Sequence, residues 1–147
     1  MKKIFEEGII VSIIMVALIS IIQILIFGKE SYTMSWHDNM FKVGFILICL
    51  FPLIYYFFIG KKDKSESIAL FLTSLILWFT GLPDVLYFWL SGKAIPFTLP
   101  WLNNSFVFSK LLDILNLTVV TNTLLLVSVA IGFVVVLLLD IWLEKVN

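Results

Sequence analysis

Residues 78–92 read WFTGLPDVLYFWLSG, and this stretch combines a membrane-like apolar composition with a helix breaker and a carboxylate. Gly81, Pro83 and Asp84 fall within four consecutive positions. Pro83 has no backbone N–H to donate to the carbonyl of Phe79, so the sequence predicts a kink or a new helix start here. A carboxylate inside an apolar span is costly and is a functional candidate by default. The stretch therefore predicts both a break in the helix and the first candidate functional residue, Asp84.

The composition of the whole chain indicates that lipid is its solvent. Of the 147 residues, 61% are hydrophobic, and the mean hydropathy is +1.10, whereas soluble domains are about 45–50% apolar. The net charge is zero, so no basic surface for nucleic acid is expected. The basic residues are all lysine, which rules out arginine clamps for phosphate. The single cysteine, Cys49, rules out an internal disulfide and redox chemistry based on a cysteine pair.

Four apolar runs are long enough to cross a bilayer, which takes about 20 residues in a helix. The predicted spans are about 8–27, 36–59, 68–90 and 122–143, within a single domain of residues 1–147. The first run is too long for a signal peptide and no A-x-A-like cleavage site follows it, so we expect it to be a span. The predicted fold class is an all-α integral membrane four-helix bundle.

The lysines near the span ends predict the orientation of this bundle. Cytoplasmic loops carry an excess of positive residues. Six lysines lie on the side of the two termini and four lie on the other side, so both termini are expected in the cytoplasm, in the cell membrane. The first group is Lys2, Lys3, Lys61, Lys62, Lys64 and Lys145, and the second is Lys29, Lys42, Lys93 and Lys110.

The segment 91–121, between spans three and four, is predicted to lie on the outer surface of the membrane. Within it, residues 105–117 read SFVFSKLLDILNL, which is typical of an amphipathic helix in the membrane interface. Trp89 and Trp101 flank or begin this region, as expected of aromatic-belt residues. The polar face of the predicted helix carries Ser109, Lys110, Asp113 and Asn116.

Span three carries a polar stripe that makes it the first candidate ligand-binding surface. Asp84 lies about 8 Å outward of the middle of the span, at 1.5 Å per residue. Two interpretations stay open. The stripe either opens a kinked, outward-facing cavity around Asp84, or Pro83 and Asp84 simply begin a short outer helix, with the carboxylate complementing its dipole. Helical steps along the stripe give Thr73, Leu77, Thr80, Asp84, Tyr87 and Ser91.

The only histidine lies at the outer start of span two, in the stretch SWHDNMFK at residues 35–42. Ser35 and Asp38 fit a capping box. Spans two and three are expected to be neighbours because a short loop joins them. His37 and Asp38 could then share an outer site with Asp84, and His37 with Asp84 could perform acid–base chemistry. No metal-binding spacing is present, so neither a metal nor another cofactor is predicted.

The remaining polar residues of the spans are predicted to serve helix packing. Small and hydroxyl-bearing side chains let membrane helices approach closely and hydrogen-bond to one another. The residues concerned are Ser12, Ser20 and Gln23 in span one, and Thr121, Ser128 and Gly132 in span four.

Three classes of function follow from these residues. The first is a non-catalytic bundle that binds a lipid or small molecule, or serves as a subunit of a membrane complex, with an outer-leaflet pocket formed by Thr73, Thr80, Asp84, Tyr87 and the outer end of span two. The second is a hydrolase-like membrane enzyme that uses His37 and Asp84. The third is a proton- or cation-coupled transporter acting as a dimer. The absence of any catalytic motif favours the first class. The expected partners are the lipid bilayer and a membrane protein or a second copy.

Overall fold

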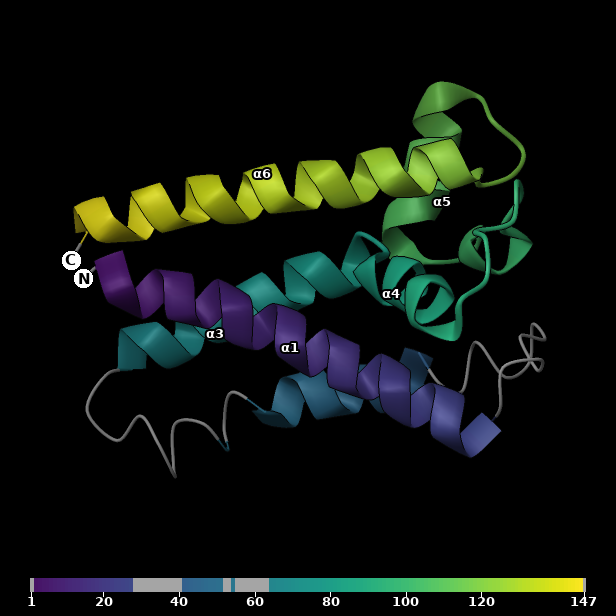
Figure 1. Ribbon diagram of the computed structural model, residues 1–147. Coiled ribbons are helices and arrows are strands. Elements are labelled where there is room, and N and C mark those ends of the chain that lie inside the picture. Colours follow the sequence, from purple (N-terminus) through teal and green to yellow (C-terminus); the bar gives the residue numbers. More distant parts are fainter. Residues whose placement is uncertain (1, 28–40, 52–53, 55–63, 147) are drawn as a thin grey trace.

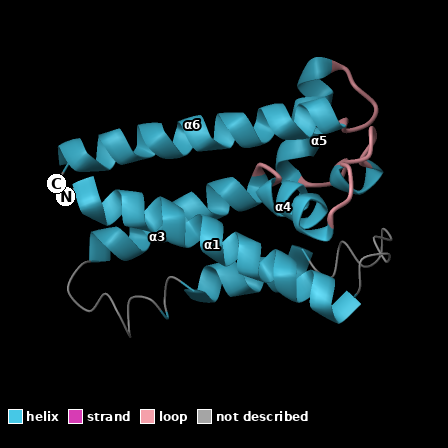
Figure 2. Ribbon diagram, viewed as in Figure 1, coloured by secondary structure: helices cyan, strands magenta, loops and turns pink. Residues whose placement is uncertain are grey.

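The computed structural model describes residues 2–27, 41–51, 54 and 64–146. Within these residues the chain is all-α, as the sequence predicts, and Figure 2 shows helices joined by loops with no strand among them. One isolated antiparallel bridge joins Thr98 to Thr121. The elements are α1 (Lys2–Phe27), the helical segment Phe41–Phe51, α3 (Lys64–Phe79), α4 (Leu82–Ser91), the 3-10 helix η1 (Pro100–Leu102), α5 (Phe106–Leu115) and α6 (Asn122–Val146).

The long helices run alongside one another, and the short elements lie together at one end (Figure 1). The start of α1 and the end of α6 lie at the opposite end. α1 packs against α3 and α4, and α6 packs against the same two helices. We call residues 92–121 the cap, because they form the loops, η1 and α5 that cover the far end of α4.

One described helix is long and apolar enough to cross a membrane by length and composition, at Asn122–Leu139 of α6. The pair Ile68–Phe79 and Leu82–Ser91 passes the same test if it counts as one broken span. The apolar runs Ile10–Leu25 and Phe41–Phe51 are helical but shorter. The helical positions agree with the predicted spans, while the remainder of the second predicted span lies outside the described residues.

Span three is not one continuous helix, because α3 and α4 are bent by 69° where they meet. The break is at Gly81, whose left-handed φ of 93° is a conformation that glycine adopts without strain. The N–H groups of Asp84 and Val85 bond to the Gly81 carbonyl at 3.2 and 3.3 Å, which starts α4 with Pro83 in its first turn. The helix-start interpretation of this stretch is therefore confirmed. The residues predicted to form one stripe on one helix face, from Thr73 to Ser91, are instead divided between α3 and α4, because the axis turns by 69° between Thr80 and Asp84.

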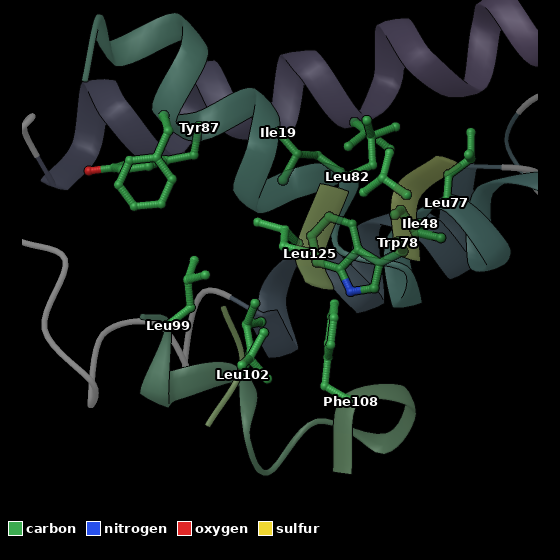
Figure 3. Packing of buried hydrophobic residues seen from close by; sticks show 14 of the residues in the cluster. Ile19, Ile48, Leu77, Trp78, Leu82, Tyr87, Leu99, Leu102, Phe108 and Leu125 are labelled. Carbon is green, nitrogen blue, oxygen red and sulfur yellow. The ribbon is translucent and has the colours of Figure 1, made fainter. Parts of the chain in front are cut away.

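Close helix approaches at glycine hold this end of the molecule together. A Cβ on Gly44 would lie 2.6 Å from Cζ2 of Trp78, so the indole ring occupies the space that a side chain would fill. A Cβ on Gly81 would overlap the side chain of Leu125. Trp78, Leu125 and Phe108 belong to one buried cluster shared by α3, α6 and α5 (Figure 3).

The aromatic rings of the segment Phe41–Phe51 pack on the C-terminal end of α3. The ring centroids of Phe41 and Trp78 lie 5.3 Å apart, and those of Phe45 and Phe79 lie 5.7 Å apart. This segment and α3 are thus neighbours, as the short connection predicts. The centroid of the Phe79 ring also lies 6.5 Å from that of Phe106 in α5.

Polar side chains between the helices pack as the sequence predicts at several positions. The Ser74 hydroxyl donates to the Ser12 hydroxyl at 3.0 Å, which joins α3 to α1 in a buried position. A Cβ on Gly132 would lie 2.5 Å from the Thr80 hydroxyl, so α6 approaches α3 closely here. The Ser20 hydroxyl instead donates to the carbonyl of Val16 in its own helix, at 3.0 Å.

Candidate functional site

Asp84 is the most deeply placed carboxylate among the described side chains, with 3% of its surface exposed. It lies in the first turn of α4, where a negative charge complements the helix dipole. Its Oδ1 accepts a hydrogen bond from the indole Nε1 of Trp101 at 3.1 Å. A hydrogen bond to an ionised group is about twice as strong as a hydrogen bond between two neutral groups. The carboxylate is therefore held by a side chain of the cap.

The backbone of the cap brings Trp101 to this position. η1 is flanked by Leu99 and contains Leu102, and both side chains are fully enclosed by the core. The Leu99 N–H donates to the Val120 carbonyl at 2.8 Å, and the Asn122 N–H donates to the Phe97 carbonyl at 3.0 Å. These two bonds close the cap as a loop whose ends lie side by side, next to the start of α6.

Asn103 joins the two arms of this loop with both ends of its side-chain amide. Its Oδ1 accepts from the Val120 N–H at 2.9 Å, and its Nδ2 donates to the Thr118 carbonyl at 3.2 Å. An amide is suited to this position because it offers an acceptor and a donor together. Asn103 follows directly on η1, so the same clamp fixes the direction of Trp101.

Two aromatic rings of α4 extend from the Asp84–Trp101 pair, because Phe88 packs against Trp101 and Tyr87 packs against Phe88. The Phe88 and Trp101 centroids lie 6.3 Å apart at an angle of 33°. Tyr87 meets Phe88 edge-on at 5.5 Å and is buried (Figure 3). Aromatic pairs in such tilted or edge-to-face arrangements contribute roughly 0.5–1.5 kcal/mol beyond burial. The geometry favours a rigid joint between α4 and the cap.

Of the other residues predicted to bind a ligand, some are buried or bonded within their own helix, and the rest lie outside the described residues. Thr73 is buried on α3. The Thr80 hydroxyl bonds to the carbonyls of Ile76 and Leu77 in its own helix, at 3.0 and 3.2 Å. His37 and Asp38 lie outside the described residues, so the site that they were predicted to share with Asp84 stays a prediction.

Trp101 is the residue whose role differs most from the sequence prediction. It was expected in an aromatic belt facing the membrane interface, but its indole is half-buried and donates to Asp84. A buried tryptophan N–H usually finds an acceptor, and Pro100 and Asn103 beside it mark an ordered turn. These features of the sequence indicate an ordered loop and a tryptophan that needs an acceptor. They do not show that the acceptor is Asp84, which lies 17 positions earlier in the chain.

Within the described residues, no group of three histidine, cysteine or carboxylate side chains comes together as a metal site. The site contains a buried carboxylate that accepts a hydrogen bond from an indole N–H, and the Phe88 ring packs against that indole. No protein-family model, curated protein or solved structure matches this chain, so its function is argued from this geometry alone.

Proposed function

We propose that this chain is an integral membrane protein with four spans, both termini in the cytoplasm and the cap on the outer face. The observation that carries the proposal is the large number of exposed apolar side chains on the long helices, together with polar groups that are buried between the helices. An apolar exterior of this extent is expected for a protein in contact with lipid or a membrane partner. The enclosed polar residues are Ser12, Ser20, Thr73, Ser74, Asp84, Ser91 and Ser128.

The apolar exterior runs along α1, the segment Phe41–Phe51 and α6. On α1 the exposed side chains recur at helical intervals, and on α6 they cover most of the surface that does not face α3 and α4. In water this apolar surface would cause the protein to aggregate. In a membrane the acyl chains of the lipids would cover it. Prominent examples are Ile10, Ile14 and Leu18 on α1, Val43, Ile46 and Leu50 on the second span, and Ile131, Val134 and Leu138 on α6.

Within the membrane we propose a non-catalytic role, as a binding protein or as a subunit of a membrane complex. Asp84 supports this choice because it is buried and its Oδ1 already accepts from Trp101, as a structural joint requires. Thr80 is likewise engaged by its own helix. An enzyme or a coupled transporter would need Asp84 to exchange its partners during each cycle, which this enclosed geometry does not favour.

The membrane topology can be tested by cysteine labelling, because the chain has one natural cysteine. In a Cys49→Ala background, Asn104→Cys places a thiol on an exposed position of the cap, and Lys145→Cys places one near the end of α6. A membrane-impermeant maleimide applied to intact cells should label the first variant only. After permeabilisation, both should react. Labelling of Lys145→Cys in intact cells would contradict the proposed orientation.

The proposed role can be tested by native mass spectrometry of the full chain released from detergent or nanodiscs. A binding or subunit role predicts bound phospholipid or a further protein chain that survives release. A bare monomer under all release conditions would contradict the role while leaving the topology intact. As a control for catalysis, the wild-type protein should hydrolyse neither phosphatidylglycerol nor phosphatidylethanolamine in vesicles. Hydrolysis that Asp84→Asn and His37→Ala both abolish would contradict the non-catalytic role.

A further inference from the structure

The cap and the last turns of α4 carry large apolar side chains that are exposed, although the interior of the cap is well packed. Four of them, on α4, on the loop before η1 and on α5, are each 73% or 74% exposed. They are Trp89, Phe97, Phe106 and Ile114. α4, η1 and α5 all lie at the same end of the molecule (Figure 1), so the four residues belong to segments at that end. We call this set the outer girdle.

A second aromatic level lies near the far end of α6. Trp142 is 57% exposed there, and Lys145 follows it in the last turn. α6 begins at Asn122, directly after the cap, so 142 − 122 = 20 residues separate the cap from Trp142. At 1.5 Å per residue this is about 30 Å, which matches the hydrocarbon thickness of a bilayer, about 30 Å. The chain thus has exposed aromatic residues at both levels where the interfaces of one bilayer would lie.

We infer that the cap is embedded in the outer interface of the bilayer, with the outer girdle among the carbonyl and upper acyl groups of phospholipids. This inference rests on the proposed membrane location and adds the depth of the cap and its lipid contacts. Aromatic side chains are enriched at such levels because one part of the ring is apolar and the other meets polar headgroups. Lys110 is exposed on α5 between Phe106 and Ile114, where its stem can follow the apolar surface while the ammonium reaches lipid phosphate.

The same placement explains why the Asp84–Trp101 pair is closed off. If the cap lies in the interface, this pair lies just beneath it, where an unshielded carboxylate would face acyl chains. The packing of Leu99 and Leu102 on the core and the Asn103 clamp keep the cap closed over α4. The outer girdle then holds the protein at a fixed depth in the membrane, and the joint beneath it excludes lipid.

Nitroxide accessibility in phosphatidylcholine vesicles tests this depth. In the Cys49→Ala background, a nitroxide is attached to Trp89→Cys, Phe97→Cys, Phe106→Cys or Ile114→Cys of the full chain. The control for water is Asn104→Cys, an exposed polar position of the same cap, and the control for hydrocarbon is Leu137→Cys, exposed on α6. The ratio of collisions with oxygen to collisions with a water-soluble nickel chelate is then measured. The outer girdle sites should give ratios several-fold above the Asn104 site and below the Leu137 site.

The outcomes separate this inference from the proposed function. Girdle ratios equal to that of Asn104 would place the cap in water and overturn the inference while the membrane location stands. Low collision rates with both reagents would mean that protein covers the girdle, which also overturns it. If the Leu137 site itself meets the nickel chelate freely, the membrane location fails first. Circular dichroism of each labelled variant confirms that its helices have formed before its ratio is used.

Discussion

The indole N–H of Trp101 donates to the carboxylate of Asp84 across 3.1 Å, joining the cap to the first turn of α4. Seventeen residues separate the two positions along the chain. Between them lie the end of α4 at Gly92 and the extended stretch that leads into η1. The bond therefore fixes a loop on the helix from which that loop departs, at the point where α4 turns away from α3.

Removing the donor of this bond should destabilise the protein. Trp101→Phe keeps an aromatic ring and deletes the N–H, and a hydrogen bond to a charged group contributes about 1.5–3 kcal/mol. The matched control is Trp89→Phe, which changes an exposed ring and should stay within about 0.5 kcal/mol of the wild type. Unfolding in mixed micelles with increasing dodecyl sulfate, followed by circular dichroism, measures both. Equal stability of the two variants would show that the joint contributes nothing to folding.

The coupling between the two residues can be measured separately from their individual effects. In a double-mutant cycle, Asp84→Leu, which has no acceptor, combined with Trp101→Phe should cost less than the sum of the two single changes, because each removes the same bond. Contacting residues show interaction energies of about 0.5–3 kcal/mol. Additive costs would mean that Asp84 and Trp101 act independently in the folded protein.

Two glycines in left-handed conformations offer a test of packing at the α3–α4 bend. Gly81 has φ 93° and Gly92 has φ 71°, so alanine at either position carries about 1–2 kcal/mol of backbone strain. Only at Gly81 would the new Cβ overlap a neighbour, the side chain of Leu125, while Gly92 has open space around it. Overpacking adds about 1–3 kcal/mol. Gly81→Ala should therefore lower the unfolding free energy more than Gly92→Ala, and the reverse order would contradict the close approach of α6.

The contact between the segment Phe41–Phe51 and α3 predicts a suppressor pair. Gly44→Ala should destabilise the protein, because the added methyl group would enter the space of the Trp78 ring. Trp78→Phe shortens that ring and also removes an indole N–H that has no hydrogen-bond partner among the described residues. The double variant should therefore be more stable than the sum of the single effects predicts. Strict additivity in the same unfolding assay would indicate that the two residues are not in contact.

The Asn103 clamp predicts a local effect on amide hydrogen exchange. Asn103→Asp keeps the acceptor for the Val120 N–H but faces the Thr118 carbonyl with an oxygen in place of a donor. Exchange at Leu99 and Val120 should accelerate, because the two arms of the cap separate more often. Asn104→Asp makes the same chemical change at an exposed neighbour and should leave both amides protected. Unchanged exchange in Asn103→Asp would show that the backbone bonds alone hold the cap.

The sequence by itself determined the helical class, the positions of the helices and the start of α4. These follow from local chemistry. An apolar run of about 20 residues favours a helix over a strand because of its length. Glycine permits the left-handed turn at Gly81, and Pro83 with Asp84 is a common helix start. The helical cap segment was also predictable, since Ser105 accepts from the Phe108 N–H as an N-cap does.

Only the tertiary structure decided what Asp84 meets and how sharply the chain turns before it. Sequence spacing gives the phase of a residue on one straight helix, and that phase is lost once the axis bends by 69° at Gly81. The partner of Asp84 comes from a loop whose course depends on the Leu99–Val120 and Asn103 bonds. Such long-range bonds leave no periodic signal in the residues that make them, so the sequence could not predict this contact. Asp84, which the sequence presents as a candidate reactive group, is held by Trp101 in a structural joint.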